Sequence, residues 1–362
     1  MLLVSYGLLT VNIEAFAEIR FATLVLDEAQ AVKNAQAQRT LAVRRIQADA
    51  RIATTGTPIE NHLGELWSLM RILNPGLLGS QDRFSKRFIA PLERDSRAPE
   101  RDTLRRLIGP FLLRRLKSQV LDELPPRTEI VVTVEPGAEE AALLAAVRRQ
   151  AVERLAQGGV AEESKRFHVL AELTRLRRAA CHPRLVAPEF KLAGAKLEQL
   201  LELVQELKEN HHRALVFSQF TDYLAIVREA FDARGVSYQY LDGSTSIKAR
   251  EIAVRDFQNG SGDVFLLSLK AGGVGLNLTA ADYVIHLDPW WNPAVEQQAT
   301  DRAHRIGQTR PVTVYKLVVK GSIEEQILSL HGAKRELVDS VLGEQEMSQP
   351  ISVEELVGLL QG

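Results

Sequence analysis

The sequence predicts an α/β chain in which two parallel-sheet domains are separated by helical insertions. With 362 residues the chain is too long for one ordinary hydrophobic core, so two domains are expected. Short apolar runs alternate with longer helical patterns in residues 1–74 and again in residues 195–320, and this alternation is typical of parallel sheets covered by helices. Residues 75–194 contain mostly helical patterns, and residues 321–362 are expected to form a C-terminal helical brace.

The first domain is expected to contain three strands. The apolar runs Leu2–Tyr6, Thr23–Leu26 and Arg51–Thr54 predict these strands, and Gln38–Ile46 predicts a helix between the last two. Because Leu2–Tyr6 has the pattern of a buried strand already in progress, we expect the chain to be a truncated piece of a longer protein.

Helical insertions are expected next, before the α/β alternation resumes near residue 195. The stretch 77–121 is helical in pattern, and a strand, Glu129–Val134, follows the chain-breaking Pro125-Pro126 pair. The remaining expected helices are Ala138–Ala156, Val169–Ala180, Lys196–Glu209, Tyr223–Arg234, Ile247–Phe257, Ala294–Ala303 and Ile323–Leu342, and the remaining strands are Ala214–Ser218, Ser237–Leu241, Val264–Leu269, Tyr283–Leu287 and Thr313–Leu317.

Composition and charge exclude several classes of protein. Hydrophobic residues make up 45% and charged residues 25% of the chain, as in an average globular protein. Lysine and arginine total 45 against 46 acidic residues, so no global basic field attracts nucleic acid, and any DNA contact must be local. The single Cys181 excludes an intrachain disulfide and a multi-cysteine zinc site. Without a membrane-length apolar run or an export signal, we expect a cytoplasmic protein with no membrane partner.

Two adjacent carboxylates, Asp27 and Glu28, directly follow the predicted strand Thr23–Leu26. In open α/β sheets, ligands bind outside the carboxyl ends of the strands. An aspartate there can hold Mg²⁺ through water and the neighbouring glutamate can orient an attacking water, which are two tasks of phosphoanhydride hydrolysis. The alternative is a helix N-cap, which a bare Asp-Glu pair favours because aspartate is common at that position.

Three further segments are candidates for a nucleotide site. The turn Thr54–Asn61 offers hydroxyls that could sense an occupied site, although ordinary turn chemistry explains the same residues. The loop Ser268–Leu278 carries three glycines whose amides could approach phosphates, but it fits neither the dinucleotide fingerprint nor Walker A. Arg302 and Arg305 are three residues apart in a predicted helix, so both would project from one face toward a triphosphate. A solvated salt-bridge pair is the alternative for these arginines.

Together these segments resemble the Swi/Snf family of ATP-dependent double-stranded DNA translocases, within the superfamily-two helicases. Asp27-Glu28-Ala29-Gln30 is similar to the Asp-Glu-Ala-His/Gln box of that family, and Thr55–Asn61 is similar to the segment that follows it. Leu176–Pro183 also resembles a family signature, and we expect a structural role for it because Cys181 and His182 lack neighbours at metal-ligand spacing. The segments similar to motifs of the second lobe, in the family's order, are Ala214–Phe220, Leu241–Thr245, Ser268–Asn277 and Gln298–Gln308.

The resemblance implies two RecA-like parallel-sheet lobes, the first incomplete here, with ATP and Mg²⁺ bound between them. Asp27 would then help to bind Mg²⁺, and Glu28 would position the attacking water. Arg302 and Arg305 would act as arginine fingers from the opposite lobe. The residues that the resemblance assigns to the nucleotide-facing surface are Gln298, Gly273 and Gly275.

Double-stranded DNA is the partner that the resemblance implies, gripped mostly through its phosphates and without sequence preference. A DNA-bound protein such as a polymerase or another complex is a further candidate partner, and in a bacterium the location would be the nucleoid. Trp291 could reach a base, although a core-packing tryptophan is nearly as well supported. The other residues that the resemblance assigns to DNA are Lys33, Asn34, Ser218, Gln219, Ser244, Thr245, Ser268 and Lys270.

One departure from the family pattern bears on activity. The sequence contains no Gly-Lys dipeptide and hence no Walker A loop, so the cradle for the β and γ phosphates is missing. We therefore expect the C-terminal part of an ATPase, inactive alone, whose first sheet lacks interior strands and exposes apolar surface. The alternative is a non-catalytic DNA-binding or scaffold remnant, which has no chemical need for both the acidic pair and the two arginines. A Rossmann-type metabolic enzyme is disfavoured because the dinucleotide fingerprint is missing.

Overall fold

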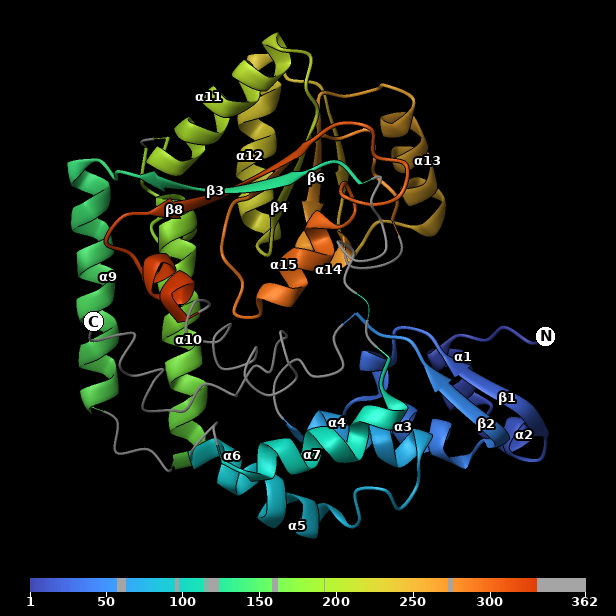
Figure 1. Cartoon of the computed structure of the whole chain (residues 1–362). Helices are drawn as coiled ribbons and strands as arrows, with labels where there is room; N and C mark the ends of the chain where they lie inside the picture. The colour runs from blue at the N-terminus through green and yellow to red at the C-terminus, as the bar shows by residue number, and fades with distance from the viewer. Residues whose placement is uncertain are drawn as a thin grey trace. The chain divides into compact units, whose positions relative to one another are not determined.

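The computed structural model describes residues 1–56, 63–94, 98–113, 115, 124–157, 162–191, 193–272 and 276–330. These residues fall into two compact units, the first ending at residue 113 and the second beginning at residue 115. Figure 1 shows the first unit in blue and cyan and the second in green to red. Each unit contains its own parallel sheet, which confirms the expected α/β class.

The sheet of the first unit consists, in the described part of the chain, of two parallel strands, β1 (Arg20–Leu26) and β2 (Gln47–Ala53). Parallel sheets are normally covered on both faces. Here Val25 is 58% exposed and Ile52 is 52% exposed. The expected exposure of apolar side chains on the first sheet is therefore confirmed.

Helix α4 (Leu63–Leu73) joins the two hydrophobic cores of the first unit. Its Leu69 and Ile72 belong to the core around the sheet, whereas Trp67 and Met70 belong to a second core formed with the helices that follow. Burial on two sides explains why most side chains of α4 are enclosed. The other helices of this unit are α1 (Tyr6–Val11), α2 (Ile13–Ala17), the 3-10 helix η1 (Ala29–Val32), α3 (Gln38–Arg45), α5 (Gln81–Phe84), the π-helix η2 (Ser85–Ile89), α6 (Ala90–Arg94), α7 (Glu100–Ile108) and the 3-10 helix η3 (Gly109–Phe111).

The strand predicted at Leu2–Tyr6 is wrong. Ser5 caps helix α1, because its hydroxyl accepts a hydrogen bond from the backbone N–H of Leu8 at 3.2 Å. Leu2 and Leu3 are exposed rather than buried. A serine at the N-cap satisfies one of the free amides of the first helical turn, and this local bond outweighs the short apolar run.

The sheet of the second unit has six parallel strands in the order β3-β8-β7-β4-β6-β5. The central strands β4 and β6 are buried along their whole length. Leu215 and Phe217 of β4 pack into one core, whereas Val216 packs into another, as a sheet covered on both faces requires. The strands are β3 (Arg127–Val134), β4 (Ala214–Ser218), β5 (Tyr238–Leu241), β6 (Val264–Ser268), β7 (Tyr283–His286) and β8 (Val312–Val319).

Helices cover both faces of this second sheet (Figure 1). Helices α11 and α12 pack on one face, and α13, α14 and α15 pack on the other. A helix described from residue 323 to residue 330 packs against the pair α9 and α10 through Ile323 and Ile327. The helices are α9 (Ala138–Gln157), α10 (Glu162–Cys181), the 3-10 helix η4 (Pro183–Leu185), α11 (Ala195–Glu209), α12 (Thr221–Arg234), α13 (Ile247–Gln258), α14 (Leu269–Gly272) and α15 (Pro293–Thr300).

The elements expected from Glu129 onward are present as far as residue 330, with two main differences. Residues 331–342 of the helix expected at Ile323–Leu342, and the rest of the expected C-terminal brace to residue 362, lie outside the described residues. Strand β3 pairs with β8, so the second sheet draws one strand from the segment 75–194 that was assigned to helical protrusions and linker. Helix α15 ends at Thr300 instead of continuing to Ala303. Within the described ranges, no helix has both the length and the apolar character needed to span a membrane.

Candidate functional site

The acidic pair lies at the carboxyl end of β1, as predicted. Asp27 and Glu28 follow Leu26, the last residue of the strand, and both are exposed. Glu28 occupies the position before η1, but its side chain makes no capping hydrogen bond, so the N-cap alternative is not supported. Its backbone is left-handed, with a φ of 48°, a conformation that non-glycine residues rarely adopt and that often marks functional sites.

Hydroxyls at the end of β2 hold the acidic pair. The Thr54 Oγ1 donates to Asp27 Oδ1 at 2.7 Å. The Thr55 Oγ1 donates to Gln30 Oε1 at 2.8 Å, and Gln30 Nε2 in turn donates to Glu28 Oε2 at 2.6 Å. A shift at the end of either strand would therefore move both carboxylates, which is the connection that a nucleotide-sensing role of these hydroxyls would need.

Tyr6 is a further contact of this edge that the sequence did not reveal. Its hydroxyl donates to the backbone oxygen of Asp27 at 2.8 Å. Burial, followed by the charges of Asp27 and Glu28, raises the pKa of Tyr6 to about 12, so the phenol keeps its proton at neutral pH. The sequence pattern around Tyr6 indicated a strand, and so its position beside the acidic pair was not foreseen.

Lys33 and Asn34, both assigned to DNA by resemblance, differ in accessibility. The Lys33 ammonium lies 3.2 Å from the carboxylate of Glu65, a residue that is only 3% exposed. The side chain of Asn34 is exposed, and its Oδ1 accepts a hydrogen bond from the backbone N–H of Gln36 at 3.0 Å. A DNA contact by Lys33 stays a prediction and would compete with its ion pair to Glu65.

In the second unit, most of the residues assigned to DNA gather at one edge of the sheet. All six strands are parallel, so their carboxyl ends share that edge. Gln219 follows β4, Asp242 follows β5, Lys270 follows β6 and Asp288 follows β7 shortly after its last residue. This is the edge at which open α/β sheets bind their ligands.

Asp242 organises the loop that carries Ser244 and Thr245. Its Oδ1 accepts hydrogen bonds from the Ser244 hydroxyl at 2.7 Å and from the Thr245 hydroxyl at 3.1 Å. The hydrogen bond from Ser244 is the main reason why the pKa of Asp242 falls to about 2, although partial burial opposes the shift. Ser244 is exposed and Thr245 is half-buried, so the loop presents polar groups held in place by one carboxylate.

The two predicted contacts that follow β6 lie in different environments. Ser268 is 4% exposed, and its hydroxyl accepts a hydrogen bond from the backbone N–H of Ala271 at 3.3 Å. Lys270 is exposed on the short helix α14. Only the lysine therefore presents its side chain to an approaching phosphate in this structure.

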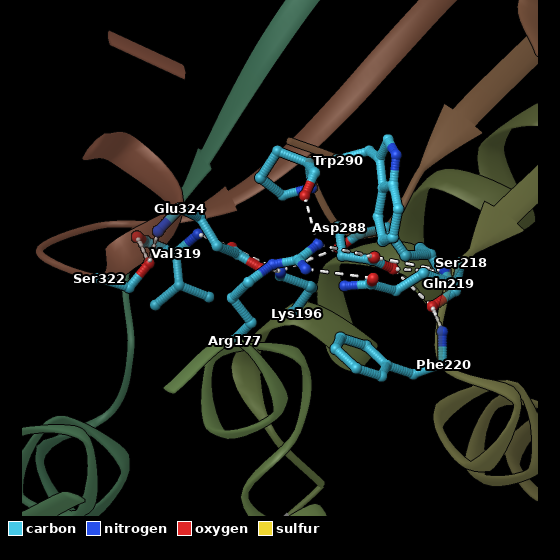
Figure 2. Close-up of polar contacts among 12 residues, drawn as sticks. Arg177, Lys196, Ser218, Gln219, Phe220, Asp288, Trp290, Val319, Ser322 and Glu324 are labelled. Atoms are coloured by element: carbon cyan, nitrogen blue, oxygen red, sulfur yellow. Dashed lines mark hydrogen bonds and ion pairs between the residues drawn. The ribbon is translucent and has the colours of Figure 1, made fainter. Parts of the chain in front are cut away.

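Asp288 is the buried centre of the edge (Figure 2). The Ser218 hydroxyl donates to its Oδ1, and the backbone N–H of Gln219 lies 3.3 Å from both carboxylate oxygens. Burial raises the pKa of Asp288 to about 6, while Arg177 and the bond from Ser218 partly oppose this shift. The hydroxyl of Ser218 is thus used internally, and its assignment to DNA stays a prediction.

Arg177 connects this edge to helix α10. Its guanidinium donates to the side-chain oxygen of Gln219 at 3.1 Å and to the backbone oxygen of Pro289 at 2.7 Å. It also lies 5.4 Å from the ring centroid of Trp290 and 5.1 Å from that of Trp291, within the range of cation–π attraction. Trp291 is half-buried and packs against the core of α9 and α10, which is the alternative left open for this residue.

A fully buried ion pair, Lys196 with Glu324, contacts Leu287, the residue that precedes Asp288. The Lys196 ammonium is 2.5 Å and 2.6 Å from the two carboxylate oxygens of Glu324, and it donates to the backbone oxygen of Leu287 at 2.9 Å. Both side chains are 0% exposed. Burial lowers the pKa of Lys196, but the Glu324 carboxylate and neighbouring groups outweigh it, and the net shift is upward. The lysine is therefore charged.

The expected placement of Arg302 and Arg305 on one helix face is wrong. The segment after Thr300 forms turns, in which the backbone oxygen of Arg302 accepts from the Leu278 N–H at 3.0 Å and Arg305 Nη1 donates to the Leu276 oxygen at 3.2 Å. Arg302 is 7% exposed and Arg305 is half-buried. Both arginines therefore contact the end of the predicted glycine loop, but by different routes.

Gln308 explains why the helix does not continue. Its Nε2 donates to the backbone oxygens of Thr279, Ala281 and Ala303 at 3.1, 2.8 and 3.1 Å. Gly307 supplies the left-handed turn, with a φ of 99°, that brings the glutamine back. The residues assigned to the nucleotide surface are otherwise placed as follows: Gln298 is half-buried on α15, and Gly273 and Gly275 lie outside the described residues.

Four residues of this arrangement were missed by the sequence analysis: Arg177, Lys196, Asp288 and Glu324. One signal could have revealed Lys196, because it occupies a position of the apolar face of α11 that also carries Leu200. A charge at such a position needs a buried partner. Among the residues that the structure describes, no group of three or more His, Cys, Asp or Glu side chains could hold a metal ion.

Two family models match the chain. The SNF2-related domain matches residues 1–185, and the helicase conserved C-terminal domain matches residues 195–307. The chain belongs to the SNF2-related family. Its members in the comparison are ATP-dependent helicases of the SWI/SNF type.

Relatives of this SNF2-family chain extend well beyond the matched part. YwqA of Bacillus subtilis is 38% identical over 98% of this chain and 39% of its own length. An uncharacterized ATP-dependent helicase of Mycoplasma pneumoniae is 36% identical over 100% of this chain and 34% of its own length. This chain thus spans 34% to 39% of the length of these relatives.

A solved structure agrees with the fold. The SWI2/SNF2 ATPase core of Sulfolobus solfataricus in complex with double-stranded DNA is 35% identical, with a TM-score of 0.52, over 92% of this chain and 70% of that one. This similarity confirms the expected RecA-like parallel-sheet lobes.

The raised pKa of Asp288 predicts a pH-dependent stability of the SNF2-family fold. Between about pH 4 and 6 the folded carboxyl keeps its proton while the unfolded one loses it, so the native state binds more protons and stability falls as pH rises through this window. Asp288→Asn should remove this contribution. Urea unfolding of the two proteins at several pH values measures it.

A matched control is Asp242→Asn, because the pKa of Asp242 falls to about 2 and this carboxylate therefore stays ionised in the folded chain throughout the window. This variant should retain the pH dependence of the parent chain. If Asp288→Asn and the parent chain lose stability with identical slopes across the window, Asp288 does not titrate as described.

Proposed function

We propose that this chain supplies two halves of the ATPase site of a motor that moves along double-stranded DNA. Membership in the SNF2-related family supports an ATP-dependent motor. The observation that carries the proposal is the acidic pair at the end of β1, held by the hydroxyls of β2 and strained at Glu28. Neither the strain nor the hydroxyl bonds would be needed by a scaffold.

The carboxylates fit the two tasks of hydrolysis. Both hydrogen bonds to the Asp27 side chain use Oδ1, and Oδ2 accepts none from the residues that the structure describes. That oxygen is suited to Mg²⁺ or to one of its waters, and Mg²⁺ would supply charge for the phosphates. Glu28 keeps an exposed side chain oriented by Gln30, and would orient the attacking water.

The two arginines supply positive charge from the second unit. Arg305 makes one described side-chain hydrogen bond, to the backbone oxygen of Leu276, so its guanidinium can be redirected with little loss. Arg302 is more enclosed. Arginine fingers that neutralise the transition state are worth about 10³ to 10⁵ in rate. Arg305 is therefore the stronger candidate finger, with Arg302 beside it.

The phosphate cradle has to come from elsewhere in the motor. The sequence contains no Walker A loop, and it matches only 39% of the length of YwqA. We propose that this chain alone hydrolyses ATP at a residual rate at most. Full activity would require the longer protein, in which Asp27 and the arginines meet a bound triphosphate.

Double-stranded DNA is the proposed track, and the relative from Sulfolobus solfataricus solved with such DNA supports it. In this chain the exposed groups suited to backbone phosphates are Asn34, Ser244 and Lys270. Contacts of this kind grip DNA without reading its sequence and weaken with salt. Such a motor would work in the cytoplasm, at the nucleoid in a bacterium, and would displace DNA-bound proteins.

The ATPase part of the proposal is tested by Arg305→Ala in the longer protein that contains this chain. ATP turnover stimulated by double-stranded DNA should fall by about 10³-fold, because the transition state loses a cation. Affinity for the DNA should stay unchanged. Steady-state ATPase assays and fluorescence anisotropy with a labelled duplex measure the two effects.

The control is Arg310→Ala. Arg310 lies on the same segment as Arg305, its side chain is 60% exposed, and it forms an ion pair with Asp282. Turnover in this variant should match the parent protein. Unchanged turnover in Arg305→Ala would dismiss the finger. Parent protein that binds duplex DNA without ATP turnover would favour the scaffold alternative.

The DNA part is tested by Lys270→Ala. Loss of one phosphate contact should weaken duplex binding equally for unrelated sequences. It should also reduce the slope of log affinity against log salt concentration by about one. Lys208→Ala is the matched control, because Lys208 lies at the far end of α11, beside Gly235 and Asp263. If both variants bind with the same salt dependence as the parent chain, α14 does not contact the DNA.

A further inference from the structure

Three arginines line one hollow of the first unit. Arg44, Arg51 and Arg71 surround a space of about 480 Å³. The remaining wall is the turn after α4, which carries Gly76 and Gly79, and Ser80. All of these residues belong to the first unit, and neither Asp27 nor Glu28 is among them.

Two of the guanidinium groups are held in place. Arg51 donates to the backbone oxygen of Ile46 at 2.7 Å and to that of Ile72 at 2.9 Å. Arg71 lies over the ring of Trp67, 4.9 Å from its centroid. Groups fixed in this way lose little freedom when they bind a ligand.

Capping of helix ends does not account for the whole cluster. Arg44 is in the last turn of α3 and Arg71 in the last turn of α4, where cations are favoured by the helix dipole. However, Arg51 already bonds the carbonyls at both of these helix ends. The dipole explains each arginine singly, but it does not explain why three of them converge.

The positive charge of the three arginines is not balanced by carboxylates of the described residues. No carboxylate in the part of the chain that the structure describes forms an ion pair with Arg44, Arg51 or Arg71. Burial, followed by the charge of Arg71, lowers the pKa of Arg44. Like charges this close destabilise the fold, and a bound anion would relieve the repulsion.

The hollow is separate from the acidic pair. Arg44 and Ile46 precede β2, whose first residue pairs with the first residue of β1, whereas Asp27 follows the last residue of β1. β1 has 7 residues, so the two ends of the strand are about 20 Å apart at ~3.3 Å per residue. Arg51 itself lies within β2, in register with Leu24, but its guanidinium bonds the carbonyl oxygens of Ile46, just before β2, and of Ile72 on α4. An anion held by these guanidinium groups would therefore be distinct from a phosphate hydrolysed beside Asp27.

We propose that the hollow bounded by Arg44, Arg51 and Arg71 binds a phosphate group. Arginine forks match phosphate oxygens in pairs and remain charged at any physiological pH. The Ser80 hydroxyl accepts from the Arg83 N–H at 3.4 Å and keeps its own proton to donate. The phosphate can belong to the backbone of a nucleic acid or to a small molecule, and both present the same oxygens.

The test uses Arg44→Gln/Arg71→Gln in the complete chain, with inorganic phosphate and pyrophosphate as probes. In the parent chain, either anion should raise the unfolding temperature saturably relative to chloride at equal ionic strength. The double variant should lose this rise and bind about tenfold more weakly or worse in calorimetry. Without anion, the unfolding temperature of the variant should stay close to that of the parent chain, because the relieved repulsion offsets the lost helix-dipole and Trp67 contacts.

Arg39→Gln is the matched control, because Arg39 is exposed on the same helix as Arg44 but does not line the hollow. It should keep the full response to phosphate. If the double variant does not fold, Arg71→Gln alone replaces it, because Arg71 is exposed and its replacement should leave the fold intact. This single variant should lose part of the rise in unfolding temperature that phosphate causes. An equal response in all variants, or none in the parent chain, overturns the proposal.

A competition arm identifies the source of the phosphate. If a short DNA duplex displaces pyrophosphate from the parent chain and binds the double variant more weakly, the phosphate is that of the DNA backbone. If the duplex binds parent and double variant equally while pyrophosphate binds only the parent, the hollow takes a small phosphorylated molecule. Both results support a phosphate site and do not depend on the proposed ATPase activity.

Discussion

The buried ion pair of Lys196 and Glu324 is the interaction on which the second unit most depends. It joins the start of α11 to the helix that follows β8, and the lysine also bonds the backbone oxygen of Leu287 at the end of β7. Glu324 in turn accepts from the backbone N–H of Val319 at 3.0 Å. Two charges without solvent persist only when each is paired and hydrogen-bonded, and both conditions are met here.

The position of the candidate DNA edge follows from this pair. Leu287 is followed by Asp288, and that carboxylate holds the hydroxyl of Ser218 and the amide of Gln219. Arg177 then connects Gln219 with the tryptophans after β7. Loosening the ion pair would therefore shift the ends of β4 and β7 together. In the first unit, the hydroxyls of Thr54 and Thr55 have the same function for the acidic pair.

Those parts of the fold that depend on local patterns could be predicted from the sequence. The continuous apolar runs of β4 and β6 indicated strands buried on both faces, and the structure buries every residue of both. The position of Asp27 and Glu28 at the end of a strand was predictable for the same reason. At this level the structure bears out the α/β class and the placement of the acidic pair, and the comparisons with known proteins bear out the family.

Features that depend on distant partners could not be predicted. The hydroxyl of Ser218 is bonded to Asp288, which is 70 positions away along the chain. The spacing of Arg302 and Arg305 is compatible with a helix and equally with a series of turns. The side-chain amide of Gln308, which donates to three backbone carbonyls, favours the turns. Ser5 similarly turned an apolar run into the start of a helix. In the last two cases a single hydrogen-bonding side chain outweighs a local sequence pattern.

The central claim is that a buried charge pair, rather than apolar packing alone, holds the edge of the second unit. It is tested most directly by urea unfolding and duplex binding of Lys196→Met, Glu324→Gln and the double variant. Each single change should cost about 3–5 kcal/mol because it leaves one buried charge without its partner, and the double variant should lose less than either. Duplex affinity should fall in the same order. Losses that simply add in the double variant, with unchanged duplex binding, would contradict the account.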